Sequence, residues 1–170
     1  MGKRIAILAE SDYEDLELWY PLLRLREAGH EPTVVGTGSN EIYYSKHGYE
    51  VKVDIPISDA RPENFDGVII PGGWAPDKLR RYNKVNGFVR KMFENGRIVG
   101  SICHGGSVLV SAGILKGMKA TSVIAIKDDM INAGARYKDE EVVVDRNLIT
   151  SRRPLDLPAF MREILKALEK

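Results

Sequence analysis

Short apolar runs alternate with helical segments along most of the chain, and this alternation most constrains the fold. The runs that indicate strands are residues 3–9, 33–36, 66–70 and 98–102. Leucines and Trp19 recur at helical spacing after the first run, until Gly29 ends the helix. Strands that alternate with crossover helices predict a mostly parallel sheet covered by helices on both faces. The sequence therefore predicts a doubly wound α/β domain.

The remaining segments add smaller elements to this plan. Apolar periodicity predicts helices at 85–93, 107–112 and 157–168, with Asp156 as the N-cap of the last one. We expect a hairpin formed by 142–144 and 148–150, and short antiparallel strands within 41–57.

Composition limits the classes of protein that the chain can belong to. Its 170 residues suit one domain spanning 1–170, and its single cysteine excludes an internal disulfide framework. A net charge of +1 without a basic stripe argues against nucleic acid and anionic membrane as partners. The chain shows no signal peptide and no apolar stretch long enough to span a bilayer. We therefore expect a cytoplasmic protein.

Cys103 lies where a buried strand should turn sharply into a helix. Residues 99–106 read Val-Gly-Ser-Ile-Cys-His-Gly-Gly, which is the setting of a nucleophile elbow. The unpaired amides and the dipole of a helix N-terminus favour a thiolate. We therefore expect the Cys103 thiol to ionise well below pH 8.5. The alternative is that a lone cysteine is a small buried hydrophobe.

Three strands should deliver polar groups to one edge of the sheet. In open parallel sheets, ligands bind outside the carboxyl ends of the strands. The first strand leads to Glu14, which we expect to point back into this cleft because it enters the following helix. A second strand ends in Pro-Gly-Gly at 71–73, where the amides of Gly72 and Gly73 can face an oxyanion or simply form a tight turn.

The histidines restrict the possible mechanisms. The chain has three, His30, His47 and His104, and none follows His104. Papain-like and glutaminase-type enzymes need a histidine well downstream of the nucleophile, so His104 is the only strong base left. Adjacent side chains at a helix start point roughly 100° apart, which leaves a bond between Cys103 and His104 open. The spacings HxxxH and CxxC are absent, so the sequence predicts neither a metal nor a cofactor.

Matching motifs span nearly the whole chain in order. They include Lys-His-Gly-Tyr at 46–49, Pro-Gly-Gly at 71–73, Ser-Ile-Cys-His-Gly at 101–105, and further segments at 14–17, 29–31, 65–66, 75–76, 127–134, 141–145, 151–152 and 161–163. On these motifs the chain resembles the ThiJ/PfpI superfamily, within its PfpI-type intracellular protease branch. The resemblance implies a flavodoxin-like three-layer sandwich of the class I glutaminase type.

The resemblance also implies roles for particular residues. Cys103 would be the nucleophile, His104 its partner, and Glu14 a carboxylic acid hydrogen-bonded to the sulfur. The family's third group is a glutamate supplied by a neighbouring subunit, and its position here holds Asp77, which is one methylene shorter. The resemblance therefore implies a homodimer or larger assembly. Trp74 would lie at the contact between subunits or, alternatively, form a wall over its own cleft.

Three functions remain open at this point. The main reading is a cysteine-dependent hydrolase that resembles the PfpI-type peptidases, with Cys103 attacking a carbonyl carbon of a peptide. The first alternative is a glyoxalase or protein deglycase that acts on α-oxoaldehydes and their adducts. The second is a non-enzymatic stress protein whose thiolate is oxidised and acts as a sensor or chaperone.

Overall fold

A seven-stranded sheet forms the centre of the molecule. The computed structural model describes residues 2–169, and the strand order of the sheet is β10-β11-β7-β6-β1-β2-β5. The strands are β1 (Arg4–Ala9), β2 (Glu31–Gly36), β5 (Ile55–Pro56), β6 (Gly67–Ile70), β7 (Ile98–Ile102), β10 (Val142–Asp145) and β11 (Leu148–Ser151). Neighbouring strands run parallel except β10, which forms the predicted antiparallel hairpin with β11.

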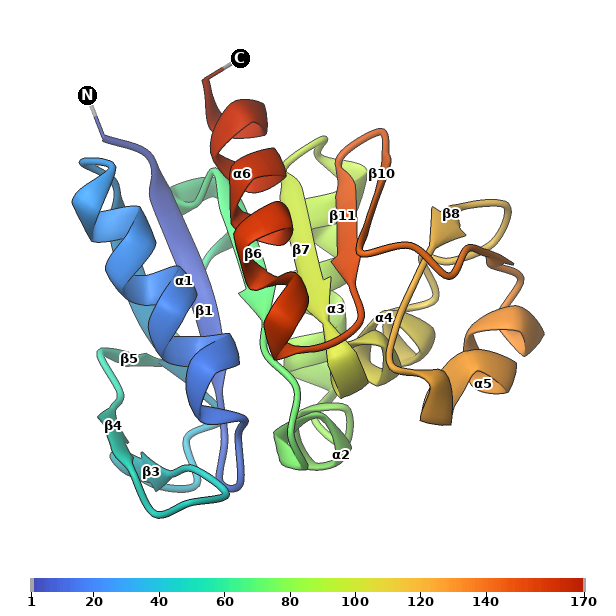
Figure 1. Cartoon of the computed structure of the whole chain (residues 1–170). Coiled ribbons are helices and arrows are strands. Elements are labelled where there is room, and N and C mark those ends of the chain that lie inside the picture. The colour runs from blue at the N-terminus through green and yellow to red at the C-terminus, as the bar shows by residue number, and fades with distance from the viewer. Residues whose placement is uncertain (1, 170) are drawn as a thin grey trace.

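Helices cover both faces of this sheet (Figure 1). Helices α1 (Asp15–Glu27) and α6 (Leu157–Leu168) pack against each other on one face. Helices α3 (Asn83–Glu94) and α4 (Gly106–Ala112) pack against each other on the opposite face. The predicted α/β three-layer sandwich with a mostly parallel sheet is confirmed.

Smaller elements lie outside the central sheet. They are the antiparallel hairpin β3 (Ile42–Tyr44) and β4 (Glu50–Lys52), the parallel pair β8 (Lys119–Ala120) and β9 (Arg136–Tyr137), and the helices α2 (Ala75–Leu79) and α5 (Lys127–Asn132). Single 3-10 turns occupy Pro62–Asn64, Cys103–Gly105, Ile124–Ile126 and Pro154–Asp156. Helices α2 and α5 are too short for apolar periodicity to predict them.

The prediction that Asp156 is the N-cap of α6 is confirmed in position but not in its side-chain hydrogen bond. Asp156 stands at the N-cap position of α6, but its carboxylate makes no hydrogen bond to the helix. It instead accepts hydrogen bonds from the Arg152 guanidinium, at 2.9 Å, and from the Arg152 backbone amide, at 3.2 Å. Asp156 is buried, and a buried carboxylate is better stabilised by a guanidinium than by a neutral amide.

Close packing of α6 on the sheet requires a glycine in β7. A Cβ atom on Gly100 would lie 2.9 Å from Ile164 Cδ1 and 3.1 Å from Phe160 Cζ. Phe160 itself is fully buried. The apolar face of α6 therefore rests directly on the backbone of β7. Within residues 2–169, no helix combines the length and the apolar character needed to cross a membrane.

This contact yields a stability prediction. Phe160→Ala should lower the free energy of unfolding by about 3–5 kcal/mol, because it removes a buried ring and leaves a cavity. Chemical denaturation measures the loss. Leu155→Ala is the control, since Leu155 is 84% exposed and should lose less than about 0.5 kcal/mol. Equal losses for the two variants would contradict the packing of α6 on the sheet.

Candidate active site

The loops that follow β1, β6 and β7 meet at one end of the sheet, as the strand order requires (Figure 1). They enclose a cavity of about 210 Å³, lined by Glu14, Glu17, Lys46, Gly73, Trp74, Cys103, His104 and Pro154. Four larger cavities, of about 230 to 590 Å³, have neither cysteine nor histidine among their described lining residues. The chemistry that the sequence predicts is therefore gathered in the smaller cavity.

Cys103 occupies a strained backbone position at the end of β7. Its φ of 59° lies in the left-handed region, which costs energy for a residue with a Cβ atom. The turn is also close to its neighbours, because a Cβ atom on Gly105 would lie 2.5 Å from the Ile70 carbonyl oxygen. In this conformation Cys103 Sγ lies 3.6 Å from His104 Nδ1. The angle expected for consecutive residues of a right-handed helix does not apply here, because the φ of Cys103 is left-handed.

A buried carboxyl group faces the sulfur, and it belongs to Glu17 rather than to Glu14. Glu17 Oε2 accepts a hydrogen bond of 2.8 Å from the Gly72 amide. A Cβ atom on Gly72 would lie 2.5 Å from this oxygen and 2.7 Å from Cys103 Cβ. Only glycine at position 72 allows the carboxyl group and the cysteine to come this close.

The position of Glu17 explains why the acid beside the sulfur is not Glu14, although Glu14 lines the cavity as expected. Side chains in the first turn of a helix lean toward its N-terminus, so Glu17 in α1 reaches back to the ends of the strands. Glu14 precedes the helix and lines the cavity, but its carboxylate pairs with Lys46, with its Oε2 3.2 Å from Lys46 Nζ. The sequence did contain a signal, because Glu17 shares the buried face of α1 with Pro21 and Leu25. An acid on an apolar helix face is unusual unless it has a partner.

Burial shifts the pKa values of both facing groups upward. It raises the pKa of Glu17 from 4.5 to about 8, although the Gly72 amide lowers it and the charge of Glu14 adds to the rise. Burial, together with the charge of an ionised Glu17, also raises the pKa of Cys103 to about 12. The amides of His104 and Gly73 act in the opposite direction but are outweighed. The expectation of a thiolate well below pH 8.5 is therefore contradicted.

The carboxyl group and the thiol share protons. Between the two pKa values, about 8 and about 12, the pair holds one proton. Glu17 Oε1 is buried without a hydrogen-bond partner, which is costly for a carboxylate oxygen. A proton on this carboxyl group, donated toward Cys103 Sγ, removes that cost and stabilises a thiolate. The negative charge on the Cys103 sulfur therefore depends on a proton being held by the Glu17 carboxyl group.

His104 is held in its neutral form. Burial lowers its pKa, the charge of Asp77 raises it, and the charge of Lys46 lowers it. The ring stands 5.4 Å from that of Trp74, which also lines the cavity. Trp74 thus forms a wall of its own cleft, while its place at a subunit contact stays a prediction. Asp77 acts on His104 within one chain, and the contact across subunits likewise stays a prediction.

The sequence predicts that the amides of Gly72 and Gly73 can both face an oxyanion, and the structure differs for Gly72. The Gly72 amide is taken by Glu17, so it does not face the cavity as an oxyanion donor. The amides of Gly73 and His104 instead point toward the sulfur and lower its pKa. These two amides are therefore the backbone donors that the structure places at the sulfur.

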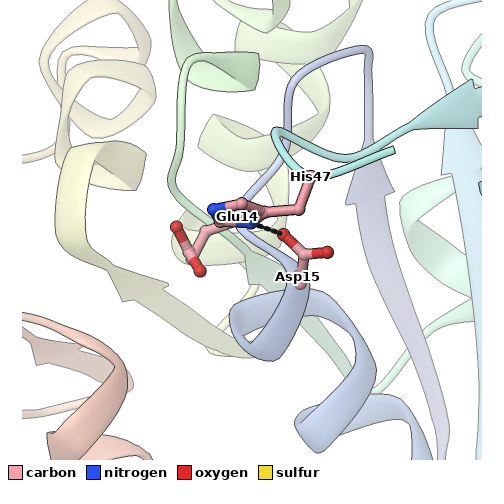
Figure 2. A group of neighbouring side chains, drawn as sticks. All are labelled: Glu14, Asp15 and His47. Atoms are coloured by element: carbon pink, nitrogen blue, oxygen red, sulfur yellow. Dashed lines mark hydrogen bonds and ion pairs between the residues drawn. The ribbon is translucent and has the colours of Figure 1, made fainter. Parts of the chain in front are cut away.

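Charged groups also cluster at the mouth of the cavity. Glu14, Asp15 and His47 place their polar atoms within 4.8 Å of one another (Figure 2). His47 Nδ1 lies 2.7 Å from Asp15 Oδ2, and Ser45 donates a hydrogen bond of 2.6 Å to Asp15 Oδ1. Both carboxylates thus already have partners, since Glu14 is paired with Lys46. The group resembles a set of metal ligands in composition, but we do not assign it as a metal site.

The raised pKa of Glu17 predicts how stability depends on pH. The folded protein holds a proton on Glu17 up to about pH 8, whereas the unfolded chain releases it near pH 4.5. The stability from this group is therefore complete below about pH 4.5 and is lost as the pH rises to 8, by at most about 1.4 kcal/mol per pH unit.

Urea denaturation between pH 5 and pH 8 gives the free energy of unfolding of the wild type and of Glu17→Gln. The difference between the two values at each pH measures this effect. The subtraction cancels the contribution of His104. The lowered pKa of His104 makes the free energy of unfolding rise with pH below about pH 6.5, which is opposite to the effect of Glu17. Glu94→Gln, at an exposed position, should behave like the wild type. Parallel curves for the wild type and Glu17→Gln would show that Glu17 is not buried as described.

The chain matches known proteins over almost its full length. The model of the DJ-1/PfpI family matches residues 3–167. Deglycase PfpI of Pyrococcus furiosus is 48% identical over 166 residues, which cover 98% of this chain and 99% of that protein. A deglycase of Thermococcus kodakarensis is also 48% identical, over 165 residues that cover 97% of this chain and 99% of that protein.

Solved structures agree with these relatives. A two-domain protein of Anabaena variabilis with DJ-1/ThiJ/PfpI-like and ferritin-like domains has a TM-score of 0.96 and 46% identity, over 98% of this chain and 48% of that one. Drosophila melanogaster DJ-1beta has a TM-score of 0.92 and 28% identity, over 99% of this chain and 91% of that one. The strand order, the cysteine turn and these similarities lead to one conclusion: the chain belongs to the DJ-1/PfpI family.

Proposed function

We propose that this protein is a cysteine-dependent deglycase or glyoxalase, which acts on α-oxoaldehydes or on the adducts that they form with amines. Several relatives at 47–48% identity carry the name deglycase, which supports the alternative reading of the sequence better than the main one. The peptidase reading is not confirmed by any of these names.

One observation carries the proposal: Cys103, His104 and Glu17 meet in a cavity of only about 210 Å³. A peptidase must hold several residues of an extended chain beside its nucleophile. A small α-oxoaldehyde needs only a short cavity with a sulfur, a base and hydrogen-bond donors. The size of the cavity therefore favours a small carbonyl substrate.

The residues suggest the following steps for a free α-oxoaldehyde. Neutral His104 takes the thiol proton as Cys103 Sγ attacks the aldehyde carbon, and the carbonyl π electrons move to oxygen. The amides of Gly73 and His104 stabilise the oxyanion, which then receives that proton to give a hemithioacetal. Glu17 then transfers the proton of this carbon to the neighbouring one, while the hydroxyl proton passes to the neighbouring carbonyl oxygen. The resulting thioester is hydrolysed by water, which yields a 2-hydroxy acid and restores the thiol.

An amine adduct can follow the same route. Sulfur replaces the amine at the carbon that carries the hydroxyl group, and the amine leaves with the proton that His104 received from the thiol. Glycated protein or amino acid is thereby released as a free amine, and the same hemithioacetal remains on Cys103. Both substrates therefore use one set of residues.

Self-association remains part of the proposal. An exposed apolar stripe on α1, formed by Leu16, Tyr20 and Leu23, supports a contact between copies of the chain. We retain a homodimer or a larger assembly on this ground.

A direct assay separates the candidate functions. The wild type should consume methylglyoxal and release free amine from a methylglyoxal-treated amino acid, and it should not cleave casein. Cys103→Ala should lower the turnover by at least on the order of 10³-fold, because Cys103 is the only cysteine of the chain. Colorimetric methylglyoxal loss and amine release measure this effect.

The outcomes differ clearly between the three functions. Casein cleavage that depends on Cys103, without methylglyoxal loss, would restore the peptidase reading. No turnover of either substrate, together with selective oxidation of Cys103 by peroxide, would favour the stress sensor.

The role of Glu17 predicts an order of thiol pKa values. In Glu17→Gln the amide oxygen can still accept from Gly72, while the NH₂ group donates to the sulfur. In Glu17→Leu the donor is lost. The thiol pKa should therefore be about one to two units lower in the Gln variant than in the Leu variant. The rate of iodoacetamide alkylation against pH measures both values, and equal values would show that Glu17 does not donate to the sulfur.

A further inference from the structure

Lys46 reaches the cavity from outside the central sheet. It lies in the turn between β3 and β4, where its backbone amide donates a hydrogen bond of 3.0 Å to the Tyr13 carbonyl oxygen. Among the described residues that line the cavity, Lys46 alone carries a permanent positive charge. A fixed backbone therefore holds one ammonium group at the cavity of Cys103.

The ammonium group of Lys46 has two neighbours. Its Nζ lies 3.2 Å from Glu14 Oε2 and 5.6 Å from the centre of the Trp74 ring. Trp74 in turn stands against His104. The charge of Lys46 also lowers the pKa values of His104 and Glu17, so its field reaches both groups beside the sulfur.

Glu14 is the only carboxylate that pairs with Lys46 in residues 2–169, and the pair is easily replaced. The Lys46 side chain is 32% exposed and the Glu14 side chain 16% exposed. An ion pair of this exposure adds little stability. A carboxylate that enters the cavity can therefore take the place of Glu14 on Lys46 at small cost.

We propose that Lys46 forms an anion subsite in the cavity of Cys103, and that the preferred substrates carry a carboxylate next to the reacting carbonyl. This inference rests on the proposed function, since it assumes that Cys103 attacks carbonyl carbons. It adds the substrate class, namely adducts of amines with oxo acids. Sulfur displaces the amine from such an adduct, and the hemithioacetal, which has no neighbouring ketone, collapses to the free oxo acid and the thiol. In this arrangement the Glu14 carboxylate pairs with Lys46 while no substrate is bound. The carboxylate of the substrate replaces it when the substrate binds.

The small size of the cavity supports this assignment. A carbonyl carbon in contact with Cys103 Sγ, inside about 210 Å³, leaves its substituents against the remaining walls. Trp74 offers an apolar face and Lys46 offers a charge. A carboxylate on the substrate can therefore face the Lys46 ammonium group while the carbonyl carbon stays at Cys103 Sγ.

Two small aldehydes make a matched pair of probes. Glyoxylate carries a carboxylate beside its aldehyde, and methyl glyoxylate carries a neutral ester there. Each forms a hemithioacetal with Cys103, in which the S–C bond forms, the carbonyl π bond breaks, and the thiol proton moves to the new hydroxyl group. Protection of Cys103 from iodoacetamide, followed by mass spectrometry, measures binding of either probe without any turnover.

In the wild type, glyoxylate should protect Cys103 at roughly ten-fold lower concentration than methyl glyoxylate. Lys46→Met keeps the apolar stem of the side chain and removes the charge. The two probes should then protect Cys103 at about the same concentration. Lys52→Met is the matched control, because Lys52 lies on β4 of the same hairpin but does not line this cavity. It should keep the wild-type preference.

A second variant should change the preference in the opposite direction. Glu14→Gln removes the competing carboxylate and should raise the preference for glyoxylate by a further factor of roughly three. Comparing the two probes within each variant cancels any change in the intrinsic reactivity of the thiol. Opposite shifts in Lys46→Met and Glu14→Gln cannot result from a common loss of folding.

The failures of the two proposals are distinguishable. If both probes protect equally in the wild type and Lys46→Met changes nothing, the anion subsite is overturned while attack on carbonyls stands. If neither probe protects Cys103 in any variant, the proposed function is overturned and the subsite with it.

Discussion

The site depends on the close approach of two side chains across Gly72. The Glu17 carboxyl group and Cys103 lie on opposite sides of this residue, and a single Cβ atom there would overlap both. The Gly72 amide is at the same time the donor that holds Glu17 Oε2. One residue without a side chain thus fixes the distance between an acid and a nucleophile. Because the acid comes from α1, the glycine from the loop after β6 and the cysteine from the end of β7, their meeting requires the strand order of the whole sheet.

The architecture was predictable because its signals are local. Apolar runs of strand length, separated by amphipathic segments, suffice for a parallel sheet with helices on both faces. The cysteine turn was predictable for the same reason, since an apolar strand, a cysteine and two glycines follow one another directly in 98–106. The short helices α2 and α5 gave no comparable pattern. The side chain of Asp156 could not be assigned either, because a guanidinium competes with the helix for it.

The identity of the acid was not predictable from position alone. Glu14 and Glu17 both follow β1, and the choice between them depends on where each side chain points relative to Gly72. Reading Glu17 as part of the buried face of α1 would have identified it. The thiol pKa was misjudged for a related reason: a helix N-terminus favours the thiolate, but burial acts in the opposite direction and is the larger effect here. Local sequence shows which dipoles are near a group, whereas the loss of solvent depends on the complete fold.

The hairpin β3–β4 has a consequence for how such an enzyme can diversify. It lies outside the central sheet and is tied to the start of α1 by a few polar contacts, such as those of Ser45 with Asp15 and of the Tyr13 hydroxyl with the Tyr49 carbonyl oxygen. Cys103, Glu17 and Gly72 all belong to the packed layers instead. Substitutions in the turn at 45–49 therefore leave the nucleophile and its acid in place while they alter the charge that an incoming molecule meets. The shape of the site and the charge at its entrance thus come from different parts of the chain, although the charge of Lys46 also lowers the pKa values of His104 and Glu17.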